Sequence, residues 1–142
     1  MFSILYYKLP RQLIHNDFHG GNVLFHIEQM TGIIDLDSCK QNVRIYDLVR
    51  FSGWLLYCMR DDRKNWLSAL SNLLHGYNSI TCLTVDEINS IFFMLYSMGI
   101  SCIATFFRTS IDDTVLYSIN ALDWIIDNRR SIDRIGEGLY PE

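Results

Sequence analysis

The chain has 142 residues, of which 49% are hydrophobic and 20% charged, so it can form one folded domain and is not intrinsically disordered. Its 12 basic and 16 acidic residues give a net charge of −4 without any run of Lys or Arg, which argues against nucleic acid as a partner. Four scattered cysteines without a CxxC pair predict free, buried thiols and a cytoplasmic location.

The first third of the chain is predicted to be rich in β-structure. Residues 22–27 have the composition of a strand, residues 28–32 that of a turn, and residues 33–35 that of a second short strand. Together they predict a β-hairpin, whose two ends lie side by side. Asn22 at the entrance and Asp35 at the exit are therefore expected to be neighbours.

The pattern becomes helical after Asp47. Residues 47–60 are apolar nearly all round, which predicts a helix deep in a core. Residues 65–77 place apolar side chains on one helical face. Thr84 followed by Glu87 is a capping-box pattern, and it predicts the start of a third helix.

An uncharged stretch at residues 91–107 continues this third helix and raises the question of a membrane span. Ser, Thr and Gly residues dilute it and no basic cluster flanks it, so a buried core helix is preferred and no membrane partner is expected. Ser110 followed by Asp113 opens the last predicted helix, and the tail at residues 136–142 is expected to fray.

The stretch LIHNDFHGGNVLF, residues 13–25, concentrates the side chains that can carry chemistry. Phosphoryl transfer needs a carboxylate that orients or deprotonates the acceptor hydroxyl, and an amide oxygen and a second carboxylate that hold magnesium. The catalytic loop of kinases runs His-x-Asp, with an Asn five residues after the Asp, which is the spacing of His15, Asp17 and Asn22. On this pattern Asp17 is the catalytic base, and His15 braces the loop. Asn22 and Asp35 are the expected Mg²⁺ ligands.

Three segments together resemble the aminoglycoside phosphotransferase/choline kinase superfamily, and within it the homoserine-kinase-like phosphotransferases. They are LIHNDFHGGNVLF, TGIIDLDSC and RIYDLVRF, which span roughly residues 9–51. The resemblance implies an ATP-dependent kinase that transfers the γ-phosphate of ATP to a hydroxyl of a small metabolite or antibiotic, with ATP and Mg²⁺ as cofactors. It gives Asp17, Asn22 and Asp35 the same roles, and it implies that Asp47 braces the catalytic loop.

The implied fold is α+β and mostly helical: a protein-kinase-like C-terminal lobe whose small β-hairpin carries the catalytic and metal-binding motifs. A single domain is expected over residues 1–142, with the catalytic loop and hairpin in residues 1–42 and a helical subdomain in residues 43–142. Fourteen residues precede His15 and no Gly-rich phosphate loop is found, so the N-terminal ATP-binding lobe is expected to be absent. Such a truncated lobe would be incomplete alone and would pair with a separate N-terminal lobe chain or with a second copy of itself.

Several residues near the motifs allow more than one interpretation. Asn16 stands where the family usually has Gly, and Asn tolerates unusual backbone angles better than most residues. Asp37 is either a further metal ligand, a contact to the acceptor, or a solvated loop carboxylate. Arg44 either contacts a phosphate or acceptor carboxylate or makes a surface ion pair.

Two other functions compete with the kinase. A zinc metallohydrolase would use His15, Asp17 and His19 with Asp35 or Asp37, although this leaves Asn22 unexplained. A non-catalytic remnant that binds another chain would be marked by an exposed apolar surface, for which the start of the chain is a candidate through Phe2, Leu5, Tyr6 and Tyr7. The acceptor stays open among homoserine-like amino alcohols, choline-like amines, sugars and aminoglycosides.

Overall fold

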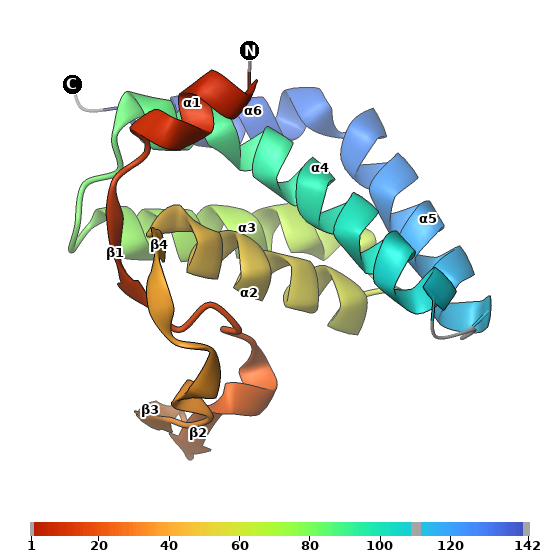
Figure 1. Ribbon diagram of the computed structural model, residues 1–142, viewed down its shortest axis with the longest axis horizontal. Helices are drawn as coiled ribbons and strands as arrows, with labels where there is room; N and C mark the ends of the chain where they lie inside the picture. The colour runs from red at the N-terminus through yellow and green to blue at the C-terminus, as the bar shows by residue number, and fades with distance from the viewer. Residues whose placement is uncertain (1, 109–111, 141–142) are drawn as a thin grey trace.

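The computed structural model describes residues 2–108 and 112–140, which form a body of helices with a β-ribbon projecting from it (Figure 1). The N-terminal part comprises α1 (Phe2–Lys8), β1 (Arg11–Ile14), a 3-10 helix (Gly20–Asn22), β2 (Val23–His26), β3 (Gln29–Ile33), a second 3-10 helix (Leu36–Ser38) and β4 (Lys40–Val43). The helical part comprises α2 (Ile45–Cys58), α3 (Arg63–Asn78), α4 (Val85–Arg108), α5 (Asp112–Asp127) and α6 (Arg129–Glu137). The fold is thus mostly helical with small antiparallel sheets, as expected.

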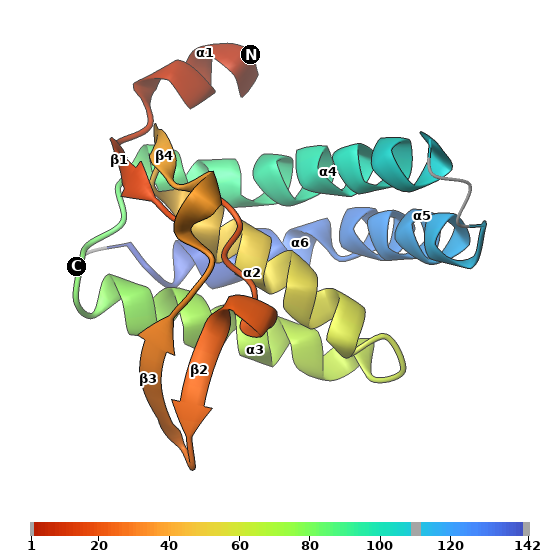
Figure 2. The same cartoon turned by 60° about the horizontal axis from the view of Figure 1, so that its bottom comes forward.

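The predicted hairpin is confirmed, but its turn is shorter than expected. Strands β2 and β3 pair antiparallel from Val23 opposite Ile33 to His26 opposite Gln29. Most of residues 28–32 is therefore strand, and the reversal takes place at Ile27 and Glu28. Ile27 has a φ of 57°, the left-handed conformation that tight hairpin turns require. Figure 2 shows this ribbon extending away from the helices.

A second antiparallel pair, β1 with β4, was not expected from the sequence. It runs from Arg11 opposite Val43 to Ile14 opposite Lys40. Pro10 extends the pairing, because its carbonyl oxygen accepts a hydrogen bond from the backbone N–H of Arg44 over 3.0 Å. This pair places the loop that follows β1 beside the first turn of α2.

The capping box at the start of α4 is confirmed. The backbone N–H of Glu87 donates to Thr84 Oγ1 over 3.2 Å, and the backbone N–H of Thr84 donates to Glu87 Oε2 over 2.8 Å. Two N–H groups that the helix itself cannot satisfy therefore have partners. The helices predicted around residues 47–60 and 65–77 are also confirmed as α2 and α3.

Helix α4 is a core helix over its first half only. Ile91 and Leu95 are buried, whereas Ile100 and Phe107 are exposed in the half that lies along α5 (Figure 2). On length and composition alone, α4 is one helix that could cross a membrane, a test that core helices also pass. The expectation of a fully buried helix is wrong for residues 100–107, and the cytoplasmic location stays a prediction.

The core forms where α2, α3, α4 and α6 meet. Trp66 is fully buried, its Nε1–H donates to the Ser52 carbonyl over 2.7 Å, and its ring packs edge-on against Trp124. Within the described part of the tail, Leu139 is 3% exposed and joins this core, so the expectation of fraying is wrong there. Residues 141–142 lie outside the described residues.

Two further expectations concern the last helix and the cysteines. The C-terminal segment forms two helices, α5 and α6, where one was predicted, and Ser110, the predicted cap, lies outside the described residues. All four cysteines are free, but none of them is buried: Cys58 and Cys82 are exposed, and Cys39 and Cys102 are partly exposed. The prediction of buried thiols is therefore wrong.

Candidate active site

Asp47 joins the loop after β1 to the start of α2. It lies in the first turn of α2, and its two carboxylate oxygens accept hydrogen bonds from the backbone N–H groups of His15 and Asn16, both over 2.8 Å. Hydrogen bonds to an ionised carboxylate are short and strong. The side chain of Asp47 therefore fixes the course of the backbone immediately before Asp17.

Asn16 adopts the conformation that its place in the motif demands. Its φ is 66°, in the left-handed region that Gly enters freely and Asn better than most other residues. Its Oδ1 also accepts a hydrogen bond from Asn42 Nδ2 over 3.2 Å. The expectation that Asn replaces Gly here without breaking the loop is confirmed.

The ring of His15 ties the loop to the end of the hairpin. The side chain is 8% exposed, and Nε2 lies 2.9 Å from the carbonyl oxygen of Ile34. The other ring nitrogen, Nδ1, is buried without a hydrogen-bond partner among the described residues. The contacts of His15 are those of a residue that braces the loop.

Asp17 faces Arg50, a residue that sequence reasoning missed. Its Oδ1 accepts hydrogen bonds from Arg50 Nε over 3.2 Å and Nη2 over 2.9 Å, and its Oδ2 lies 3.6 Å from His19 Nε2. Arg50 is three residues after Asp47 in α2, so the two share one face of the helix. That spacing is the signal through which Arg50 could have been found.

Asn22 and the segment before Asp35 lie side by side, as the hairpin predicted. The Asn22 carbonyl oxygen accepts a hydrogen bond from the backbone N–H of Ile34 over 3.0 Å. The amide Nδ2 of Asn22 donates to the Asp17 carbonyl oxygen over 3.0 Å, which leaves Oδ1 as the acceptor end of a buried side chain.

Asp35 and Asp37 are the carboxylates at the exit of the hairpin. Asp35 has a φ of 61°, its side chain makes no capping hydrogen bond to the 3-10 helix that it precedes, and it is exposed. Asp37 lies within that 3-10 helix and is also exposed. The amide oxygen of Asn22 and these carboxylates are hard oxygen donors, the kind of ligand that fits Mg²⁺.

The arrangement does not favour the zinc alternative. Within residues 2–108 and 112–140, no group of three or more His, Cys, Asp or Glu side chains is placed to hold a metal ion. His15 Nε2 is paired with the Ile34 carbonyl, and His19 Nδ1 accepts a hydrogen bond from the backbone N–H of Gly21 over 3.0 Å. His19 is therefore a cap of the 3-10 helix Gly20–Asn22.

Arg44 forms a partly buried ion pair with Glu87, which corrects the expectation of a surface pair or a phosphate contact. Its Nε and Nη2 donate to the two oxygens of Glu87, each over 2.7 Å, and Nη2 also donates to the Cys82 carbonyl over 2.7 Å. Glu87 is fully buried. Burial tends to raise the pKa of Glu87, but the hydrogen bonds from Arg44 and Thr84 outweigh it and lower the pKa below its ordinary value.

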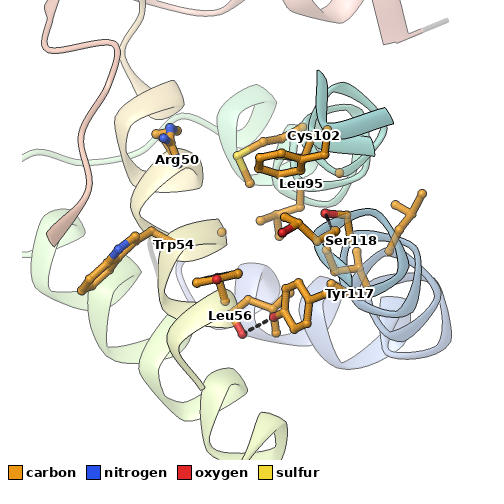
Figure 3. Close-up of a pocket in the computed structure, with 16 residues that line it drawn as sticks. Arg50, Trp54, Leu56, Leu95, Cys102, Tyr117 and Ser118 are labelled. Atoms are coloured by element: carbon orange, nitrogen blue, oxygen red, sulfur yellow. Dashed lines mark hydrogen bonds between the residues drawn. The ribbon is translucent and has the colours of Figure 1, made fainter. Parts of the chain in front are cut away.

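A cavity of about 340 Å³ opens between α2, α4 and α5 (Figure 3). Its walls are mostly apolar, with Trp54 and Leu56 from α2, Leu95 from α4 and Tyr117 from α5 among them. Arg50 is the one charged side chain among the described residues that line it. The residue that holds Asp17 thus also borders the cavity.

Comparisons with known proteins bear on this site. The model of a family described as "Phosphotransferase enzyme family" matches residues 4–81. The chain is 32% identical over 80 residues to a homoserine kinase of Zymomonas mobilis subsp. mobilis and to one of Granulibacter bethesdensis; each match covers 56% of this chain and 24% of the relative. A homoserine kinase of Sinorhizobium medicae is 29% identical over 84 residues, covering 58% and 25%. The chain thus spans about a quarter of the length of these relatives. No solved structure matches the chain significantly.

Proposed function

The chain belongs to the phosphotransferase enzyme family, and from this premise we propose that it carries the catalytic loop of a kinase that transfers the γ-phosphoryl group of ATP to a hydroxyl of a small molecule. The observation that supports this most is the brace made by Asp47, which fixes the backbone of His15 and Asn16 and thereby presents Asp17 at the end of a rigid loop. The homoserine kinases among the relatives suggest homoserine, an alcohol that also carries a carboxylate, as the first acceptor to test.

Asp17 is the proposed catalytic base. Arg50 occupies its Oδ1, whereas among the described residues Oδ2 has only the longer contact to His19. Oδ2 is therefore the oxygen that we expect to accept the hydroxyl proton. His15 is proposed as a brace, and it takes no proton in this scheme. The carboxylate of Asp17 contributes by orienting the hydroxyl as well as by accepting its proton.

Asn22 and Asp35 are the proposed Mg²⁺ ligands, through Oδ1 and the carboxylate respectively, and Asp37 is the third candidate. A bound magnesium ion would neutralise negative charge on the phosphates of ATP. The hydrogen bond between Ile34 and Asn22 supports this assignment, because it joins the two strands beside both ligands. The bond from Asn22 Nδ2 to Asp17 further couples this site to the catalytic loop.

A second candidate function is a non-catalytic module that binds another chain. It is favoured by a group of exposed apolar side chains on or next to the projecting ribbon, here called the ribbon surface: Leu24, Phe25, Ile27, Met30, Ile33, Ile34 and Leu36. A concentration of exposed apolar side chains on one element is typical of a surface that binds a partner. Either a nucleotide-binding lobe on a separate chain or a second copy of this chain is the proposed partner.

Calorimetry with ATP tests the kinase proposal on the 142-residue chain. We expect Mg²⁺-dependent ATP binding that is lost in Asp35→Ala and kept in Asp61→Ala, a matched change of an exposed carboxylate outside the site. Binding that is equal with Mg²⁺ and with a chelator, or unchanged in Asp35→Ala, would remove Asp35 from the metal site. No binding in any variant would favour the non-catalytic module.

Phosphoryl transfer tests Asp17 itself, in the chain or in any complex that has activity. Asp17→Asn is close in shape to Asp17 but cannot accept the proton, so we expect transfer to be abolished while ATP binding and the far-ultraviolet circular dichroism spectrum stay unchanged. Unchanged turnover in this variant would rule out Asp17 as the base.

A further inference from the structure

The cavity between α2, α4 and α5 has a chemistry that selects its ligand. A volume of about 340 Å³ suits a small molecule, and its mostly apolar walls suit one with an apolar body. Figure 3 shows the lining side chains of α2, α4 and α5 around this space, with Arg50 on α2. No carboxylate belongs to the described lining, and the nearby carboxylate of Asp17 is already paired with Arg50, so the cavity wall favours a negative group over an ammonium group.

Two of the four hydroxyl groups in the described wall, those of Tyr117 and Ser118, are already engaged inside the protein. Tyr117 donates its O–H to the Leu56 carbonyl over 2.7 Å, and Ser118 Oγ donates to the Thr114 carbonyl over 2.8 Å. Both hydroxyl protons are therefore used inside the protein. Apart from Arg50, this leaves mainly the hydroxyls of Tyr57 and Thr114 as side-chain partners in a mostly apolar wall. A sugar has more hydroxyls than these partners can pair, and each polar group buried without a partner costs free energy.

Arg50 has donors left for a ligand after it has bound Asp17. A guanidinium group carries five N–H bonds, and the contacts to Asp17 use Nε and Nη2. Within the described part of the chain, Nη1 makes no hydrogen bond. Because guanidinium binds carboxylates through parallel hydrogen bonds, Arg50 can hold Asp17 and a second carboxylate together.

We infer that the cavity binds the acceptor and that the acceptor is an alcohol with an apolar body and a carboxylate, which Arg50 recognises. This inference rests on the proposed function for the role of acceptor, and it deepens that function by stating the substrate class. A carboxylate bound to Arg50 lies on the same guanidinium group as Asp17, so the ligand is held next to the proposed base. Arg50 is then a specificity-determining residue that also orients Asp17.

Calorimetry with two matched probes on the 142-residue chain tests this inference without ATP or Mg²⁺. The probes are 3-hydroxyoctanoate and 1,3-octanediol, which share an apolar chain and a hydroxyl at C3. They differ at C1, where the first has a carboxylate and the second a hydroxyl. We expect the carboxylate probe to bind at least about tenfold more tightly, the order expected for hydrogen bonds between ionised groups. Equal binding of the two probes, or no binding of either, would overturn the inference.

Variants connect this preference to Arg50 and to the cavity. Arg50→Met keeps a long side chain without charge and should abolish the preference for the carboxylate probe, whereas Arg50→Lys should keep part of it. Arg60→Met makes the same change at an exposed arginine near the end of α2 and should leave the preference unchanged. Cys102→Phe narrows the cavity and should weaken the binding of both probes. A preference that survives Arg50→Met would contradict the assignment.

The same measurements separate this inference from the proposed function. Selective binding of the carboxylate probe in a chain that does not bind ATP would support the cavity assignment and count against catalysis by this chain alone. Binding of ATP with Mg²⁺ but of neither probe would leave the kinase proposal standing and overturn the substrate class.

Discussion

Asp47 shows how one side chain can set the geometry of a whole loop. It is the acceptor for two consecutive backbone N–H groups, at His15 and Asn16, and it sits in the first turn of a helix whose later turn supplies Arg50. The N-terminal end of a helix also stabilises a carboxylate through the helix dipole. The loop that carries Asp17 is therefore anchored on both sides by α2.

Removing this anchor should loosen the loop without unfolding the helical body. In Asp47→Ala the two N–H groups lose their acceptor, at a cost of about 1–3 kcal/mol in the free energy of unfolding. Hydrogen exchange should become faster at the amides of His15 and Asn16. In Asp47→Asn, which keeps one acceptor oxygen, the exchange rates should lie between those of the unsubstituted chain and Asp47→Ala. Unchanged exchange at both amides in Asp47→Ala would show that the brace is unimportant.

Gly20 is a second residue at which a single contact, here with the ring of Trp54, determines which side chains fit. A Cβ atom added there would collide with the indole ring of Trp54, which also packs against Phe51. We expect Gly20→Ala to lower the free energy of unfolding by about 1–3 kcal/mol, the usual cost of overpacking.

Gly76 provides the matched control for this change. It lies within α3, and an added Cβ atom would meet nothing within 4 Å. Gly76→Ala should raise the free energy of unfolding by about 0.5–1 kcal/mol, since Ala loses less conformational freedom in a helix than Gly. Urea unfolding measures both changes, and equal effects of the two substitutions would contradict the crowding at Gly20.

The part of the site that sequence predicted is the part set by local spacing. His15, Asp17, Asn22 and the hairpin neighbour Asp35 follow a pattern in which chain distance determines spatial distance. The contact of Arg50 with Asp17 was not predicted, because the two residues are 33 positions apart and the contact depends on how α2 packs beside the loop. The cavity was not predicted either, because it depends on how three helices that are distant in sequence pack together.

At the scale of elements, periodicity and caps predicted the helices, whereas strand pairing was predicted only where it was local. Strands β1 and β4 are short and mostly exposed, with the sequences RQLI and KQNV, so neither shows the apolar alternation of a half-buried strand. Their partners are also far apart in sequence. The extra helix α6 was missed because its sequence is highly polar, and its core contacts depend on single residues such as Ile132 and Ile135.

The ion pair between Arg44 and Glu87 makes the connection between α2 and α4 dependent on pH. The folded-state pKa of Glu87 lies below the value of about 4.3 for an unperturbed Glu. The pair's contribution is therefore fully present above that value and is lost as the pH falls through the lower, folded pKa. Breaking a buried pair by removing one partner typically costs about 3–5 kcal/mol.

Glu87→Gln should therefore lower the free energy of unfolding at neutral pH, and the difference from the unsubstituted chain should shrink as the pH falls below about 4.3 and through the lower, folded pKa. Urea unfolding across this range measures it. Asp61→Asn, at an exposed carboxylate, is the control and should follow the unsubstituted chain at every pH. A constant difference between Glu87→Gln and the unsubstituted chain would mean that Glu87 does not titrate with folding.

At the scale of the whole molecule, the helical body buries its apolar side chains in a core, whereas the ribbon leaves its apolar side chains exposed. The body has a continuous core that includes residues of every long helix, α2 to α5, and of α6. The ribbon has no core of its own, and its two strands leave unpaired edges besides the apolar side chains of the ribbon surface. Edges of this kind pair readily with other chains. Covering this surface is the most direct way in which a partner could stabilise the chain.

Ile27→Lys tests whether the ribbon surface is an interface. Ile27 is 87% exposed at the tip of the ribbon, so placing a charge there removes no core contact and should leave the free energy of unfolding within about 0.5 kcal/mol of its original value. If a second copy of the chain covers the ribbon, Ile27→Lys should weaken self-association in sedimentation equilibrium, because the interface would have to bury an unpaired ammonium group. Ile80→Lys is the matched control, since Ile80 is 88% exposed beyond the end of α3 and away from the ribbon. Association that both substitutions weaken equally, or that neither weakens, would exclude the ribbon as the contact between copies.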